Sequence, residues 1–284
     1  MGSLFGTLGL PPCCSARAES RSVALNAIEA ALLGVVQGLT EFFPVSSSGH
    51  LVLFQTLFGG RDGGELLFEV SVHVATLFAI VAFYRDRIRS LIAGLFAWNR
   101  EAVEYVGKLV VATVPSVIVG LTAKDWIETQ FSNPLLVGCA LLVTGAIVFS
   151  TNWTAARAFA AGPGWAVAVI IGLAQAFAIL PGISRSGSTV AVALALGVAP
   201  RPAAEFSFLL GIIAISGAAV LMLPGLSEVE PGKLLDIGIG SLTALMSGLI
   251  AIWLFVRMLD RSLFHYWAWY CWAVGGAFLV WSLS

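Results

Sequence analysis

Long apolar runs separated by short polar clusters are the main pattern of this 284-residue chain. A helix that crosses the roughly 30 Å hydrocarbon layer of a membrane needs about 20 apolar residues. Six runs of about that length lie between charged clusters, at Leu66–Tyr84, Tyr105–Leu121, Pro134–Ser150, Ala204–Leu223, Leu234–Val256 and Phe264–Leu283. The pattern predicts an all-α polytopic membrane protein with six transmembrane helices.

Two further apolar regions, Val23–Phe58 and Gly164–Ala199, are each too long for a single span. Proline, glycine and a serine cluster interrupt both regions near the middle, and these residues favour breaks between helices. We therefore expect a helix, a break and a shorter helix in each region, which we interpret as two re-entrant helical hairpins. A short interfacial helix is expected at Ser90–Trp98, because arginines flank that segment on both sides.

The composition excludes a water-soluble protein. Hydrophobic residues make up 58% of the chain and charged residues 11%, whereas soluble proteins carry about 25% charged residues. The net charge of −1 gives no indication of a nucleic-acid partner. The four cysteines have no metal-binding spacing. Residues 1–22 lack the pattern of a secretory signal and are interpreted as a flexible leader without an assigned function.

An internal repeat relates the two broken regions. A shift of 138 positions aligns Gly34 with Gly172, Gln37 with Gln175, Ser46 with Ser184, Ser48 with Ser186 and Gly49 with Gly187. Residues 23–150 and residues 151–284 then each comprise one broken hairpin followed by three spans. Because three is an odd number, the second half must be upside down relative to the first. Such an inverted-topology repeat is typical of transport proteins, whose broken helices meet near the membrane midplane.

The distribution of basic residues predicts the orientation. If both hairpins return to the side that they entered, one set of loops holds eight arginines and the opposite set holds three basic residues. The positive-inside rule places the richer set in the cytoplasm, so both termini are expected outside. The richer set is Arg85, Arg87, Arg89, Arg100, Arg157, Arg201, Arg257 and Arg261, and the other set is Arg61, Lys124 and Lys233.

The polar residues of the two breaks are the candidates for chemistry. Non-helical backbone at membrane depth is tolerated only where protein or trapped water satisfies its amides, so both breaks are expected to line one polar cavity. Arg185 of the second break requires an anionic partner in a membrane interior, and Glu41 of the first break is the resident candidate. The guanidinium fork, the serine hydroxyls and the start of a helix after Gly187 suit phosphate oxygens. We therefore expect a phosphate or diphosphate ligand in a lipid-facing site.

Simpler interpretations stay open at this point. Glu41 and Arg185 could form a structural ion pair, and serines and glycines in membrane helices often serve only close packing. The remaining ionisable residues inside or beside the spans are interpreted as interfacial or supporting groups. These residues are Glu29, Glu69, His73 and Glu205.

At the two breaks the chain resembles the BacA-type undecaprenyl-diphosphate phosphatases. The first motif runs from Gly34 to His50 and reads GVVQGLTEFFPVSSSGH; the second comprises GLAQA from Gly172 and PGISRSGST from Pro181. The resemblance implies six spans, two re-entrant hairpins and commonly a homodimer. It implies hydrolysis of undecaprenyl diphosphate to undecaprenyl phosphate and phosphate at the outer face of the bacterial inner membrane. That reaction recycles the lipid carrier of cell-wall synthesis and confers bacitracin resistance.

The resemblance also implies roles for residues. Glu41, Ser47, His50 and Arg185 are expected to be catalytic, with Ser47 as nucleophile and His50 or Glu41 taking its proton; a water activated by Glu41 is the alternative. Substrate binding is expected from Gln37, Ser46, Ser48, Ser184, Ser186 and Thr189. A divalent cation, Mg²⁺ or Ca²⁺, is expected at Glu41. Many members have two carboxylates one turn apart, whereas this chain has Gln37 at the first position, so the substrate's phosphates would supply most metal ligands.

Two other functions compete with this hypothesis. The second large superfamily of membrane phospholipid phosphatases also contains a Ser-Gly-His sequence, but its Lys-x₆-Arg-Pro element is absent from this chain. A polyprenyl-phosphate transporter or flippase is the alternative from another class, because it would share the inverted repeat.

Overall fold

The structure is a computed structural model that describes residues 26–58, 65–222 and 234–283. These residues fold into helices joined by short connections, with one isolated bridge between Ala160 and Val198. The leader, residues 1–22, lies outside the described residues. The fold of the described chain is all-α, as the sequence predicted.

Both broken regions form a pair of short helices. The first comprises α1 (Ala27–Phe42) and α2 (Ser47–Phe58), and the second comprises α9 (Trp165–Phe177) and α10 (Arg185–Ala195). Asn26 caps α1 in a capping box with Glu29, which satisfies amides that the first helical turn leaves unpaired. Pro44 follows Phe43, the C-cap of α1, and its missing N–H and fixed φ disfavour continuation of the helix.

Four long apolar helices are long enough to cross a membrane, and a fifth span is present if the bent pair α3 and α4 is counted as one. They are α5 (Arg100–Thr122), α7 (Pro134–Phe149, continued by the short α8, Thr151–Thr154, and η1, Ala155–Arg157), α11 (Pro200–Met222) and α12 (Leu234–Asp260). The described chain is therefore a multi-pass membrane protein.

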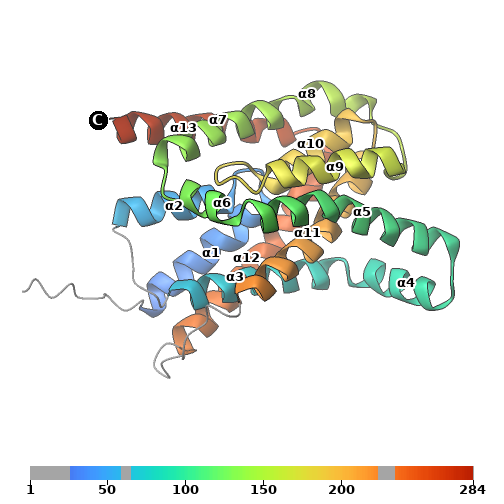
Figure 1. Ribbon diagram of the computed structural model, residues 1–284, viewed down its shortest axis with the longest axis horizontal. Coiled ribbons are helices and arrows are strands. Elements are labelled where there is room, and N and C mark those ends of the chain that lie inside the picture. Colours follow the sequence, from blue (N-terminus) through green and yellow to red (C-terminus); the bar gives the residue numbers. More distant parts are fainter. Residues whose placement is uncertain (1–25, 59–64, 223–233, 284) are drawn as a thin grey trace, which may run out of the picture.

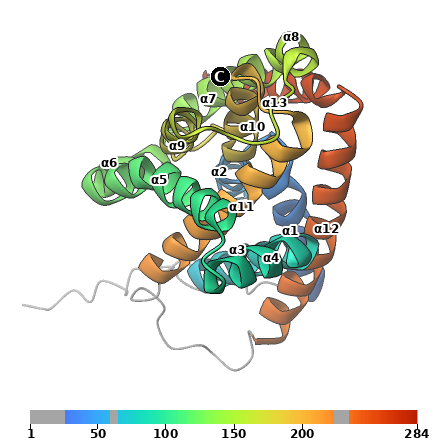
Figure 2. The ribbon, with the colours of Figure 1, turned by 90° about the vertical axis from the view of Figure 1, so that its right-hand side faces the viewer.

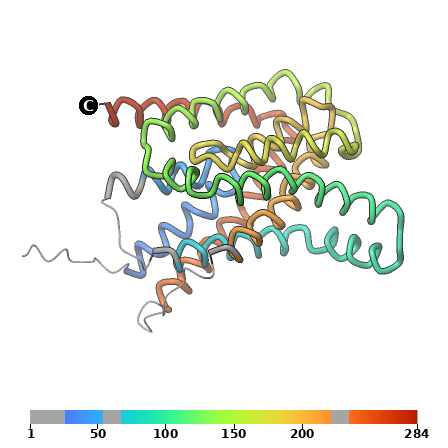
Figure 3. Tube along the Cα trace, viewed as in Figure 1, coloured from blue at the N-terminus to red at the C-terminus, as the bar shows by residue number. Residues whose placement is uncertain are grey.

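The remaining helices refine the predicted boundaries. The helix α3 (Glu65–Phe83) bends by 76° into α4 (Arg85–Phe96), so the expected interfacial helix at Ser90–Trp98 begins earlier and continues the preceding span. Figure 3 shows the chain turning back after α4, where α5 begins. The last predicted span begins with the short turn η4 (Phe264–Tyr266), and α13 covers Trp267–Leu283; the short α6 (Lys124–Gln130) precedes α7.

Glycines let each hairpin's first helix lie against a long helix. Beside α1, a Cβ on Gly34 would clash with the carbonyl oxygen of Gly240, and one on Gly38 with Ser247, both in α12. Beside α9, a Cβ on Gly172 would clash with the carbonyl oxygen of Ala112 in α5. Residue numbers rise together along the contact of α1 with α12, so these two helices run parallel.

The helices α5 and α9 are also parallel. Gly107 lies against Trp165 and Ala112 lies against Gly172, so residue numbers again rise together along the contact.

The helices α7 and α13 lie side by side, and α3 packs against α1, α11 and α12 (Figure 1). Figure 2 shows α2 and α10 in the middle of the molecule, surrounded by the longer helices. The aromatic core beside the breaks includes Phe42, Phe208 and Phe255, whose rings meet edge to face.

The two breaks touch each other. A Cβ on Gly49 would lie 3.1 Å from Cα of Gly182, and one on Gly187 would lie 3.0 Å from Cβ of Pro44. Thr144 of α7 fixes the second break, because its hydroxyl donates to the Gly182 carbonyl at 2.8 Å and accepts from the Ser184 amide at 3.0 Å. Residues far apart in the sequence thus reach one buried place.

Candidate active site

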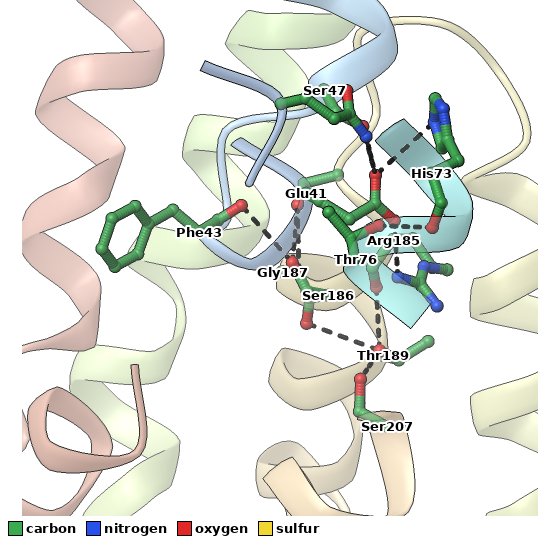
Figure 4. Close-up of polar contacts among 12 residues, drawn as sticks. Glu41, Phe43, Ser47, His73, Thr76, Arg185, Ser186, Gly187, Thr189 and Ser207 are labelled. Carbon is green, nitrogen blue, oxygen red and sulfur yellow. Dashed lines mark hydrogen bonds and ion pairs between the residues drawn. The ribbon is translucent and has the colours of Figure 1, made fainter. Parts of the chain in front are cut away.

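Glu41, in the last turn of α1, is the centre of the polar cluster (Figure 4). Its Oε1 accepts from Nη2 of Arg185 at 2.9 Å. Its Oε2 accepts from the Ser47 hydroxyl at 2.7 Å and from Nε2 of Gln37 at 3.1 Å. The Glu41 side chain is only 7% exposed. A buried carboxylate is stable when it is paired and hydrogen-bonded in this way.

Arg185 is the first residue of α10 and brings a positive charge to the first break. Its side chain is 17% exposed. Its Nη1 is buried and has no hydrogen-bond partner within the described part of the chain. The guanidinium lies against Gly211 of α11, where any Cβ would clash with Nη1. Because a guanidinium can bind two oxygens at once, Nη1 is left to donate to a ligand oxygen.

Matching serines cap the second helix of each hairpin. The Ser46 hydroxyl accepts from the Gly49 amide at 3.2 Å, and the Ser184 hydroxyl accepts from the Gly187 amide at 3.1 Å. The neighbouring pairs also correspond: Ser46 lies 3.2 Å from Ser48, and Ser184 lies 3.3 Å from Ser186, between hydroxyl oxygens. These hydroxyls, proposed from the sequence to bind substrate, are thus also engaged in ordering the helix starts.

Ser47 follows the cap Ser46, which has the left-handed φ of 65°. That conformation is uncommon for a residue other than glycine and asparagine, and such strain is often found at functional sites. It places the next residue, Ser47, at the beginning of α2 with its hydroxyl on Glu41.

His50 does not contact Ser47 through a hydrogen bond within the described chain. Its Nδ1 lies 2.8 Å from the Ser46 carbonyl oxygen, and its Nε2 lies 2.8 Å from the Tyr270 hydroxyl of α13. The carbonyl can only accept, so Nδ1 carries the hydrogen and Nε2 accepts from Tyr270. Both ring nitrogens are therefore occupied in holding the turn before Ser47.

Three contacts of the cluster were not anticipated from the sequence. His73 of α3 has its Nε2 3.8 Å from Oε2 of Glu41. Ser207 of α11 lies 2.6 Å from the Thr189 hydroxyl, which also donates to the Arg185 carbonyl at 2.8 Å. Tyr270 binds His50. The sequence signal for His73 is an ionisable residue inside an apolar span, which is a functional-site hypothesis by default.

A divalent cation would find one carboxylate here. Within the described ranges no group of three or more His, Cys, Asp and Glu side chains is arranged to hold a metal ion. Glu41 already accepts from three donors, and Gln37 presents its amide nitrogen to it. The residues fit a Mg²⁺ that is bound through one carboxylate and the substrate's phosphates, and they do not fit a site made by protein alone.

The arrangement can bind an anion and activate a hydroxyl. Nη1 of Arg185 has no hydrogen-bond partner among the described residues, and the Ser47 hydroxyl donates to the Glu41 carboxylate, which can take its proton. Nucleophile and base at hydrogen-bond distance, with the base oriented by a third group, are typical of covalent catalysis.

Comparison with known proteins adds independent information. The sequence model of a family described as "Bacitracin resistance protein BacA" matches residues 30–277. An undecaprenyl-diphosphatase of Syntrophotalea carbinolica is 39% identical over 264 residues, which cover 90% of this chain and 99% of that protein. An undecaprenyl-diphosphatase of Desulforudis audaxviator is 40% identical and covers 85% of this chain and 92% of its own. "Undecaprenyl-diphosphatase 3" of Acinetobacter baylyi is 34% identical over 87% of this chain and 94% of its own.

Proposed function

Because the chain belongs to the family of bacitracin resistance protein BacA, we propose that it hydrolyses undecaprenyl diphosphate to undecaprenyl phosphate and inorganic phosphate. The activity recycles the lipid carrier of cell-wall synthesis, and through it confers bacitracin resistance. The observation that carries the proposal is the contact of Glu41 with both Arg185 and Ser47 where the two breaks meet.

The diphosphate binds at Arg185 while its prenyl chain stays in lipid. Phosphoryl transfer depends mainly on positioning and on charge stabilisation of the phosphoryl oxygens. The open Nη1 of Arg185 donates to an oxygen of the terminal phosphoryl group, and the hydroxyls and amides at the beginnings of α2 and α10 add neutral donors. Gln37 holds Glu41 in place from one helical turn away.

Ser47 attacks the terminal phosphorus in this mechanism. The Oγ–P bond forms, the bridging P–O bond breaks, and its electron pair leaves with undecaprenyl phosphate. Glu41, 2.7 Å away, accepts the hydroxyl proton; this geometry favours Glu41 over His50 as the group that receives it. Water then hydrolyses the phosphoserine. Trapping phosphate on residue 47 by rapid quenching tests the covalent route, and activity that survives Ser47→Ala refutes it in favour of water attack.

We propose that a divalent cation binds to the protein together with the substrate. Glu41 would hold it on the protein side and the diphosphate oxygens would provide further ligands, and the ion would neutralise phosphate charge. We expect chelation to reduce phosphate release and added Mg²⁺ or Ca²⁺ to restore it. Phosphate release that does not change when a chelator is added would contradict the role of the cation.

We propose six spans and two re-entrant hairpins in an inverted repeat of residues 23–150 and 151–284. The proposal is supported by the pairing of α1 with α12 and of α9 with α5, in which the corresponding residues Gly34 and Gly172 make close approaches to the partner backbone. Both short helices run parallel to their partner. We also propose that the protein lies in the bacterial inner membrane with the site open to the outer side; the arginine-rich loops support this orientation. A homodimer is proposed on the resemblance alone, and cross-linking in native membranes tests it.

Replacing the two charged partners tests the function. In detergent, with an isoprenyl diphosphate as substrate, we expect Arg185→Ala to lower kcat/KM by about 10³-fold, the order seen when a charge-stabilising arginine is removed. Glu41→Ala should fall to a similar level. The matched control is Arg201→Ala in the first turn of α11, whose exposed side chain pairs with Asp260, and it should leave turnover unchanged.

Detergent removes the two sides of the membrane, so the assay also separates hydrolysis from transport. A flippase without hydrolytic activity would release no phosphate. Wild-type turnover by both Arg185→Ala and Glu41→Ala would refute the proposed site.

A further inference from the structure

An imidazole that the sequence did not assign to the site faces its carboxylate. His73 lies in α3, and its Nε2 is 3.8 Å from Oε2 of Glu41, the same oxygen that accepts the Ser47 hydroxyl. The His73 side chain is 35% exposed, against 7% for Glu41. His73 therefore adjoins the carboxylate and is less buried than it (Figure 4).

Backbone geometry fixes the tautomer of His73. Its Nδ1 lies 2.8 Å from the carbonyl oxygen of Glu69, one helical turn earlier. A carbonyl oxygen accepts only, so Nδ1 carries the hydrogen of the neutral ring and Nε2 presents its lone pair. Nε2 lies 3.8 Å from Oε2 of Glu41, where a proton from Ser47 would arrive.

His50 is arranged differently, because both of its nitrogens have partners. The Ser46 carbonyl and the Tyr270 hydroxyl lie 2.8 Å from Nδ1 and Nε2 respectively. If Nε2 of His50 accepted a proton, it would lose the hydrogen bond that it accepts from Tyr270. Nε2 of His73 makes no such hydrogen bond within the described residues, so it can accept a proton without that loss.

Gln37 contacts the same oxygen of Glu41 but cannot share its proton. It donates its amide to Oε2 at 3.1 Å, and an amide does not take up a proton. We propose that His73 is a catalytic proton-transfer residue of this chain, which takes up the proton that Glu41 receives from Ser47. The inference rests on the proposed function.

Protons balance in both steps of the reaction proposed above. As the Oγ–P bond forms and the bridging P–O bond breaks, the Ser47 proton passes to Glu41 and on to Nε2 of His73, which becomes an imidazolium. In the second step, the oxygen of water bonds to phosphorus and the Oγ–P bond breaks. Oγ of Ser47 takes back the proton held by His73. Water keeps one hydrogen on the phosphate and releases the other through Glu41 to solvent.

The first variant is His73→Gln, which keeps a hydrogen-bonding side chain and removes proton transfer. General acid–base groups contribute about 10²–10⁴-fold, so we expect kcat to fall by at least about 100-fold with farnesyl diphosphate in detergent, while KM changes little. His265→Gln is the matched control, since His265 packs against Phe149 and Tyr266 in η4, and it should retain full activity.

The second variant combines His73→Gln with Gln37→Glu, which introduces a second carboxylate one turn from Glu41 as an alternative proton acceptor. We expect this double variant to recover at least about tenfold of the lost kcat, which a merely structural role of His73 would not predict. Recovery also excludes misfolding as the cause of the first loss.

Unchanged kcat in His73→Gln would overturn the role of His73 alone. A double variant no more active than the single variant would do the same. Absence of phosphate release by the unaltered chain would overturn the proposed function and this inference together.

Discussion

Gly182 is the residue at which the second break turns toward the first. Its φ is +94°, and a Cβ there would lie 2.6 Å from the carbonyl oxygen of Val137. The left-handed conformation costs an L-residue about 1–2 kcal/mol, and overpacking adds about 1–3 kcal/mol. We expect Gly182→Ala to lower the melting temperature in detergent and to reduce phosphate release, because Ser184 and Arg185 follow directly.

Gly197 separates these two contributions. Its φ is +87°, yet nothing lies within 4 Å of an added Cβ. Gly197→Ala should therefore carry only the conformational cost and keep its activity. Equal losses in melting temperature for the two variants would contradict the steric part of this account.

Some contacts at this scale could be predicted from the sequence, and others could not. A lone arginine and a lone glutamate in apolar breaks must find each other, so the 2.9 Å contact of Arg185 with Glu41 follows from the cost of unpaired charge. The position of His73 depends on how α3 is rotated against α1, which no local pattern specifies. The partners of His50 depend in the same way on where α13 places Tyr270.

At the scale of elements, close helix contacts hold the hairpins in place. Gly172 of α9 and Gly34 of α1 each lie on a backbone carbonyl of a neighbouring long helix. We expect Gly172→Ala to push α9 away from α5 and lower the melting temperature measured by intrinsic fluorescence, with a cost of about 1–3 kcal/mol as for other overpacked sites.

The control is a glycine in a helix with free space around it. Gly217 of α11 has no neighbouring atom within 4 Å of an added Cβ, and alanine is the better helix former by about 1 kcal/mol. Gly217→Ala should keep or raise the melting temperature. A stable Gly172→Ala variant would show that α9 is free to shift on α5.

The apolar runs predicted the bounds of most helices closely, because every helix that crosses the hydrocarbon layer needs about 20 apolar residues. Their ends differ where polar residues continue a helix into the headgroup region. The helix α5 begins at Arg100, before the predicted span, since Asn99 caps it and Glu104 pairs with Lys108 at 2.7 Å. The interfacial helix expected at Ser90–Trp98 implied a change of direction after the preceding span, and the structure has a 76° bend there, with α4 at Arg85–Phe96. Hydropathy did not indicate where this helix begins and ends.

At the scale of the whole molecule, the proposed topology puts the two ends of α5 on opposite sides of the membrane. We expect a membrane-impermeant maleimide to label Ser132→Cys, between α6 and α7, in intact cells. Glu101→Cys, in the first turn of α5, should react only after the membrane is opened. Both positions are exposed, and mass-tag shifts on gels measure the labelling.

The background for this experiment lacks Cys13, Cys14 and Cys139 and retains Cys271, which is buried. Full labelling of both cysteines in disrupted membranes is the control for reactivity. The reverse pattern in intact cells would invert the proposed orientation, and equal labelling would contradict the span. The repeat and the arginine count predicted this arrangement, and the repeat also predicted that the two breaks meet. The atoms that touch there, such as Gly49 against Gly182, depend on three-dimensional packing.

The pairing of Glu41 with a residue 144 positions later has a consequence for biosynthesis. The ribosome delivers the first hairpin to the insertion machinery long before Arg185 has been translated. Until then the carboxyl group must stay near the headgroups or enter the lipid as the neutral acid, since an unpaired buried charge is too costly. The catalytic centre is therefore completed late, when the second hairpin arrives, and a truncated nascent chain cannot contain it.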